Sequence, residues 1–303
     1  MVQTLRQRSS TGEAHLSEVR KVWDGKAVLG EGPVWDVERA VLWFVDIKQH
    51  EVHRLDPLSG ETRQWPAPEQ IGWVLPSRDG KLVAGLQSGL ASFDPANGEF
   101  APIAAVEPDL PTNRLNDSTT ARDGSIWFGT MDDGQTNACG RFYRWDGKQV
   151  SAAAIDPVTI TNGPALSPDQ STLYHVDTVG RTIHASQLDA SGRVLSTRNF
   201  ATIDPEDGNP DGCSTDSAGN IWLGLWGGWR ARLYSPDGDI IRDVRLPASN
   251  VTKVALGGSN LTTAFVTTAR AGLTDQELGE QPDAGCVFSF EVDIPGLPTP
   301  VAT

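Results

Sequence analysis

Carboxylate or carboxamide side chains stand at equivalent places in four of six stretches of this chain that align without a gap. The stretches recur every 41 to 49 residues, and their first residues are Glu31, Gly72, Asn116, Asn162, Asp211 and Thr252. Carboxylate and carboxamide oxygens are the ligands that hard divalent cations such as Ca²⁺, Mg²⁺ and Mn²⁺ prefer. If the fold brings the two carboxylates and two carboxamides together, they can therefore form a metal site.

The repeats also predict the elements that carry these residues. Each copy has a short apolar-leaning run, a turn such as 122–124, and then a run rich in β-branched and aromatic residues such as 125–130. A period of about 40 to 50 residues with short strands is typical of a four-stranded propeller blade, whereas helical repeats space apolar residues by three and four. The sequence thus predicts an all-β fold, a six-bladed β-propeller. In such a fold, equivalent positions at the start of the innermost strands meet at one mouth of the central channel.

A simpler interpretation of the aligned positions exists. Asn and Asp are common where a strand follows a turn, so each of these residues alone could mark a strand start. Their recurrence at one register in four of six copies favours the ring of ligands.

The ends of the chain differ from the repeats. Residues 1–14 are polar, and we expect them to form a disordered tail before a single propeller domain over 15–293. Residues 15–23 alternate as a strand does, and we expect them to pair with the last strand, at 286–292, and to close the ring. Residues 294–303 contain three prolines and are expected to be a tail rather than a strand.

Composition excludes several classes of function. The 303 residues carry a formal net charge of −14 without a cluster of Lys and Arg, which argues against nucleic acid as a partner. No apolar run approaches the roughly 18 to 20 residues that cross a bilayer, and the N-terminus lacks the apolar core of a signal peptide, so we expect no membrane contact and a cytoplasmic location. The three cysteines are dispersed and are expected to be free thiols, and a monomer is the expected state.

Several motifs, in order along the chain, resemble the SMP-30/gluconolactonase/LRE family, which includes regucalcin and bacterial sugar lactonases. They are GEGPVW at 30–35, NRLND at 113–117, TNGPALSPD at 161–169 and PDG at 210–212. The resemblance covers about residues 20–290 and is closest to bacterial aldonolactonases such as xylonolactonase. It implies the same six-bladed fold and the hydrolysis of a sugar lactone to the aldonic acid.

The resemblance also implies roles for individual residues. Glu31, Asn162 and Asp211 correspond to ligands of one divalent metal ion, and Arg114 and Asn116 to residues that contact the substrate. A glutamate that some relatives carry is replaced here by Gly134, which leaves open whether Asp132 or Asp133 takes its place; we expect Asp133 to contact the substrate.

A mechanism for lactone hydrolysis follows from these roles. A lactone needs its carbonyl polarised and a water deprotonated, so a divalent ion and Asp211 as general base would suffice. The identity of the metal (Ca²⁺, Fe²⁺, Mn²⁺, Mg²⁺ or Zn²⁺) and of the lactone stay open. Two other functions stay open as well: a non-catalytic calcium-binding regulatory propeller, and a related esterase or organophosphatase.

Overall fold

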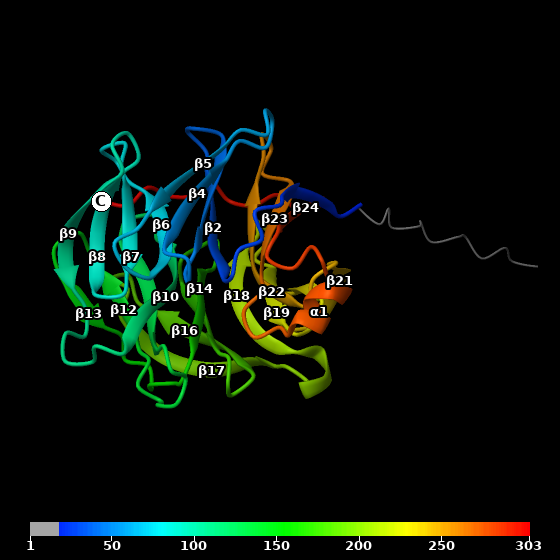
Figure 1. The fold of residues 1–303 in the computed structure, drawn as a ribbon. Coiled ribbons are helices and arrows are strands. Elements are labelled where there is room, and N and C mark those ends of the chain that lie inside the picture. Colours follow the sequence, from blue (N-terminus) through cyan, green and yellow to red (C-terminus); the bar gives the residue numbers. More distant parts are fainter. Residues whose placement is uncertain (1–17) are drawn as a thin grey trace, which may run out of the picture.

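The computed structural model describes residues 18–303 and consists of six four-stranded antiparallel sheets arranged around a central axis (Figure 1). The predicted all-β, six-bladed propeller is confirmed. In blades 1 to 5 the strands follow one another in chain order, so that the first strand of each sheet is the innermost. Short turns join neighbouring strands because consecutive antiparallel strands need few connecting residues.

Blades 1 to 3, with the turns and connections beside their strands, supply most of the polar residues discussed below. Blade 1 contains β2 (Gly30–Asp36), β3 (Val41–Asp46), β4 (Glu51–Leu55) and β5 (Thr62–Pro66). Blade 2 contains β6 (Ile71–Pro76), β7 (Leu82–Leu86), β8 (Gly89–Asp94) and β9 (Glu99–Ala105). Blade 3 contains β10 (Asn113–Thr120), β11 (Ile126–Asp132), β12 (Phe142–Trp145) and β13 (Val150–Ala152).

The other three blades complete the ring. Blade 4 contains β14 (Thr161–Leu166), β15 (Thr172–Asp177), β16 (Thr182–Leu188) and β17 (Val194–Thr202). Blade 5 contains β18 (Asn209–Thr215), β19 (Ile221–Trp226), β20 (Arg230–Tyr234) and β21 (Ile240–Arg245), and the short 3₁₀-helix η1 (Pro205–Asp207) precedes it. Blade 6 contains β22 (Asn250–Gly257), β23 (Thr263–Ala269), β24 (Val287–Glu291) and, as its outermost strand, β1 (Arg20–Trp23), and the helix α1 (Asp275–Glu280) lies between β23 and β24.

The N-terminal strand closes the ring. β1 pairs antiparallel with β24, with Arg20 opposite Ser289, so the predicted pairing of the two ends of the domain is confirmed. This pairing covers an edge that would otherwise expose unpaired backbone groups. The predicted disordered tail, residues 1–14, and residues 15–17 of the predicted first strand lie outside the described part of the chain.

Large side chains from the strands fill the space between neighbouring blades. Trp73 of blade 2 lies 6.0 Å from Phe128 of blade 3, and Trp35 of blade 1 stacks on Phe265 of blade 6 at 5.5 Å between ring centroids. All four rings are buried. Because aromatic rings bury much apolar area with few rotatable bonds, these contacts hold the blades at fixed angles around the channel.

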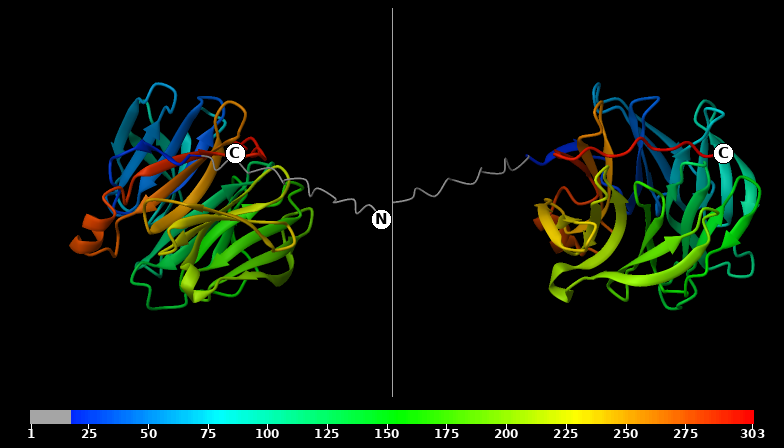
Figure 2. Two further views of the ribbon diagram at one scale, coloured as in Figure 1. Left: turned by 90° about the vertical axis from the view of Figure 1, so that its right-hand side faces the viewer. Right: turned by 180° about the vertical axis from the view of Figure 1, so that it is seen from behind.

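The C-terminal residues cross one end of the channel. Gly296 donates a backbone hydrogen bond to Leu261 in blade 6, and Ala302 donates one to Pro76 in blade 2. Both acceptors lie at or beyond the ends of inner strands, so the segment crosses the mouth opposite the one where the inner strands begin. The right-hand view of Figure 2 shows this red segment running across the molecule. Within 294–303 pairing is limited to isolated bridges, yet Ala302 is fully buried.

Candidate active site

All six inner strands are irregular at the aligned position, which the sequence did not predict. The register with the second strand of the blade shifts at or beside each of these residues, for example between Glu31 and Val34 and between Pro210 and Cys213. The other shifts lie at Ile71/Trp73, Leu115/Ser118, Asn162/Ala165 and Val251/Val254. A β-bulge redirects a side chain and is common beside functional sites. The repeated bulge gives six inner strands the same distortion at one mouth.

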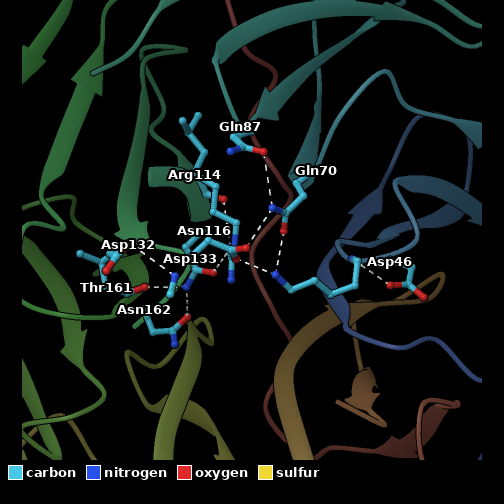
Figure 3. A network of polar contacts seen from close by, with 12 residues as sticks. Asp46, Gln70, Gln87, Arg114, Asn116, Asp132, Asp133, Thr161 and Asn162 are labelled. Carbon is cyan, nitrogen blue, oxygen red and sulfur yellow. Dashed lines mark hydrogen bonds and ion pairs between the residues drawn. The ribbon is translucent and has the colours of Figure 1, made fainter. Parts of the chain in front are cut away.

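Three of the predicted residues form a continuous chain of hydrogen bonds between blades 3 and 4 (Figure 3). Arg114 donates from Nη1 to Oδ1 of Asn116 at 2.6 Å, and Asn116 donates from Nδ2 to Oδ1 of Asn162 at 2.9 Å. Asn162 in turn donates to Thr178 Oγ1 at 3.0 Å. These bonds fix the amide orientations and direct the guanidinium towards the mouth of the channel.

The two predicted carboxylate ligands, Glu31 and Asp211, are buried and close enough to affect each other. Burial raises the pKa of Glu31 to about 8. Burial also raises the pKa of Asp211 well above its ordinary value, and the charge of Glu31 adds to this increase. The charges of both carboxylates act on Arg114 and favour its protonated form, although burial lowers the pKa of that guanidinium.

A divalent cation fits this arrangement. Within residues 18–303 neither carboxylate forms an ion pair with Lys or Arg, because Arg114 pairs with Asp133 and Lys253 pairs with Asp117. A buried carboxylate without a cation is costly, and two of them together with a carboxamide oxygen would offer the all-oxygen set that hard divalent ions prefer. No three His, Cys, Asp or Glu side chains in that part of the chain converge on a metal position, so the carboxamide of Asn162 would have to be the third ligand.

The two remaining aligned positions do not supply ligands. At Gly72 a Cβ atom would lie 2.6 Å from the carbonyl oxygen of Leu115, so blade 3 approaches too closely for a side chain there. The Thr252 hydroxyl donates to the carbonyl of Gly30 at 2.7 Å and thereby joins blade 6 to blade 1. Blade 2 therefore contributes no side chain to the ring, and we call this part of the mouth the opening above blade 2.

Side chains from blades 1, 2 and 3 fill the opening above blade 2. Lys48, in the turn after β3, donates from Nζ to Asp133 Oδ1 at 2.6 Å and to Gln70 Oε1 at 2.9 Å. Gln70 donates to Asp133 Oδ2 at 3.1 Å, and Arg114 Nε donates to Asp133 Oδ1 at 2.8 Å. Burial by itself would raise the pKa of Asp133, but these three donors outweigh it and lower that pKa to about 2.

The structure distinguishes the two aspartates that could replace the glutamate missing at Gly134. Asp132 accepts hydrogen bonds from the backbone and side chains of Thr136 and Asn137, so its carboxylate is used within its own loop. Asp133 lies at the mouth, but three protein donors already occupy its carboxylate. The contact that we expected between Asp133 and a substrate stays a prediction, and its observed role is to hold Arg114 and Lys48.

A buried ion pair that the sequence analysis missed spans the channel just beyond the ring. Lys253 donates from Nζ to Asp117 Oδ1 at 2.5 Å, and both side chains are at most 8% exposed. The two residues directly follow aligned positions in blades 3 and 6, which face each other in a six-bladed ring. The sequence signal that could have revealed this pair is the presence of opposite charges at the same register in two blades that face each other. Both residues line a cavity of about 420 Å³, and so do residues 297–300 of the C-terminal segment.

Removing one partner of this pair should destabilise the protein strongly. We expect Lys253→Met to lower the free energy of unfolding by about 3 to 5 kcal/mol, because Asp117 is left buried and without a cation. The double variant Asp117→Asn/Lys253→Met should be more stable than Lys253→Met, since it removes the stranded charge. Urea unfolding of the three proteins measures both differences. Equal stability of the single and double variants would contradict the ion pair described above.

The match to a known family is specific. A family model described as "SMP-30/Gluconolactonase/LRE-like region" matches residues 29–270, which include five of the six blades and two of the four strands of the sixth. The chain belongs to this family. The match covers all the aligned residues of the channel mouth, and the family predicted from the motifs is confirmed.

Named relatives in the SMP-30/gluconolactonase/LRE-like family resemble the chain over nearly its whole length. It is 34% identical to a 6-deoxy-6-sulfogluconolactonase of Pseudomonas putida over 91% of this chain and 95% of the relative. It is 35% identical to an L-arabinolactonase of Azospirillum brasilense over 91% of this chain and 92% of the relative. The crystal structure of a calcium-binding protein, regucalcin, from Agrobacterium tumefaciens superposes with a TM-score of 0.91 at 28% identity, over 95% of this chain and 98% of that one.

Proposed function

We propose that this protein is a sugar lactone hydrolase that uses one divalent metal ion held by Glu31, Asn162 and Asp211. The observation that carries the proposal is the pair of buried carboxylates, without a cationic partner in residues 18–303, next to a guanidinium at the channel mouth. The names of the two bacterial lactonases support the reaction class, and the calcium-binding neighbour supports a divalent ion. When bound, the ion would polarise an ester carbonyl and lower the pKa of a water molecule.

The side chains of the mouth then have distinct tasks. Arg114 and Asn116 bind the hydroxyls and carbonyl of the lactone, and the guanidinium stabilises the negative charge that develops on the carbonyl oxygen. Asp211 accepts a proton from the attacking water as the oxygen bonds to the carbonyl carbon. The bond between that carbon and the ring oxygen breaks, and the ring oxygen takes up the proton to become the hydroxyl of the aldonic acid.

Two features of the mouth disfavour the other functions considered. An ion that only stabilises the fold needs no guanidinium beside it, whereas Arg114 is held there by Asp133 and Asn116. An esterase or organophosphatase for apolar substrates needs an apolar pocket, but Lys48, Gln70 and Arg114 make this mouth polar. A small, hydroxyl-rich lactone suits it better.

The substrate class can be tested with a panel of lactones. We would follow acid release from pentono- and hexonolactones, an aryl ester and an organophosphate, with the protein supplied with each divalent metal in turn. Hydrolysis of sugar lactones at rates well above those for the aryl ester and the organophosphate supports the proposal. Calcium binding without hydrolysis of any lactone would favour the regulatory propeller.

The monomeric state, the cytoplasmic location and the absence of nucleic-acid partners stay predictions. None of the helices in residues 18–303 is long and apolar enough to cross a membrane.

A further inference from the structure

The opening above blade 2 presents hydrogen-bond donors rather than acceptors. Lys48 Nζ uses two of its three protons on Gln70 and Asp133, and the Nη2 group of Arg114 has no partner within residues 18–303. The acceptor between them is largely used, because three donors occupy the carboxylate of Asp133, which has about four acceptor positions. An incoming molecule therefore meets unused N–H groups at this part of the mouth.

The net charge of the side chains at the opening, like their unused N–H groups, favours an anionic ligand. Lys48 and Arg114 carry two positive charges, and Asp133 supplies one negative charge between them, so the three groups together are cationic. Asp46, the carboxylate next to Lys48 in sequence, is 2% exposed and accepts backbone N–H bonds from Leu29, Lys48 and Gln49. It fixes the turn that carries Lys48, and in Figure 3 Asp46 lies away from Asp133 and Arg114.

The position of Lys48 also suits contact with a ligand. Its side chain is 35% exposed, so its ammonium group can reach solvent, while Arg114 is buried. Hydrogen bonds run from Lys48 through Asp133, Arg114 and Asn116 to the proposed metal ligand Asn162. A lactone with its carbonyl at the ion would thus direct its far end towards Lys48.

We propose that Lys48, with Arg114, forms an anion subsite that favours sugar lactones carrying an acidic group in addition to the lactone ester, such as a terminal carboxylate, sulfonate or phosphate. This inference rests on the proposed lactonase function and specifies its substrate class. Lysine provides a charge-assisted hydrogen bond to such a group, and Gln70 and Asp133 hold the ammonium in place. Neutral lactones can bind at the same mouth through hydroxyls but gain less from the charge.

The test compares matched lactones on matched variants. The substrates are D-gluconolactone and its derivatives with a terminal carboxylate, sulfonate or phosphate, and kcat/KM is measured for each with wild type and Lys48→Met. Methionine keeps the unbranched stem and removes the charge. We expect the ratio of kcat/KM for at least one acidic lactone to that for D-gluconolactone to fall about ten- to hundredfold, mainly through KM. Lys48→Arg should restore most of the ratio.

Lys81→Met is the control, because Lys81 is also exposed and paired with an aspartate, Asp94, but lies in the turn at the other end of its inner strand. It should leave the ratio unchanged. An unchanged ratio in Lys48→Met would overturn the anion subsite. If the ratio is unchanged while both values of kcat/KM fall, Lys48 only positions Arg114. If wild type hydrolyses neutral lactones but none of the acidic ones, the subsite is wrong and the lactonase function stands; if it hydrolyses no lactone with any metal, the function itself is wrong.

Discussion

Replacing Asp211 with asparagine is expected to lower kcat for lactone hydrolysis roughly a hundredfold to ten-thousandfold, the usual contribution of a positioned general base. Asparagine has the same shape but cannot accept the proton of the attacking water. It also removes one of the two buried negative charges near the proposed ion, so metal affinity should fall too. Saturating metal should restore binding of the ion without restoring kcat.

The same substitution at Asp237 is the matched control. Asp237 lies in an exposed turn of the same blade, between β20 and β21, and Asp237→Asn should retain the activity of wild type. Steady-state kinetics and the metal content of each purified variant provide the two readouts. Retention of both the ion and more than about a tenth of kcat by Asp211→Asn would show that another group accepts the proton.

Replacing Glu31 with glutamine should change stability in opposite directions with and without metal. In the metal-free protein at pH 8, ionised Glu31 is buried near Asp211 without a cation, so Glu31→Gln should be more stable than wild type by about 2 to 4 kcal/mol. In saturating metal the order should reverse, because an ion that binds the folded state stabilises it and the variant has lost a charged ligand. Urea unfolding in chelator and in excess metal measures both differences.

The pH dependence of this difference identifies its cause. The pKa of Glu31 in the folded metal-free protein is raised from the ordinary value of 4.5 to about 8, so the folded state binds more protons than the unfolded state between these values. Protonated Glu31 therefore makes its full contribution to the stability of metal-free wild type below pH 4.5. This contribution is lost as pH rises towards 8. The advantage of Glu31→Gln should be near zero at pH 4 and large at pH 8. An advantage that does not depend on pH would mean that the charge of Glu31 is not responsible.

The repeat register alone was enough to predict the blades and the positions on their inner strands. Propeller blades are built from local hairpins, so sequence order maps directly onto blade order, and an aligned position maps onto a ring. The structure brings Asn116 into contact with Asn162 and places Arg114 near Glu31 and Asp211 as this reasoning requires. The same alignment could have revealed the Lys253–Asp117 pair, because the register fixes which blades face each other.

The side chains above blade 2 could not be predicted in the same way. Lys48 and Gln70 lie in connections outside the aligned strands, and their contact with Asp133 depends on the open position at Gly72. The alignment shows a glycine at this position, but not that the backbone of blade 3 approaches it closely. For the same reason the sequence could identify Asp133 as a mouth residue without showing that three protein donors occupy it.

The most direct test of the metal site is a titration of chelator-stripped protein with a divalent ion while lactone hydrolysis is followed. We expect negligible hydrolysis without the ion and a rise to a plateau at one ion per chain. Asn162→Ala should require a higher concentration of the ion to reach its own plateau. Hydrolysis at the full rate by the stripped protein, with no ion detected by elemental analysis, would contradict a metal centre at Glu31, Asn162 and Asp211.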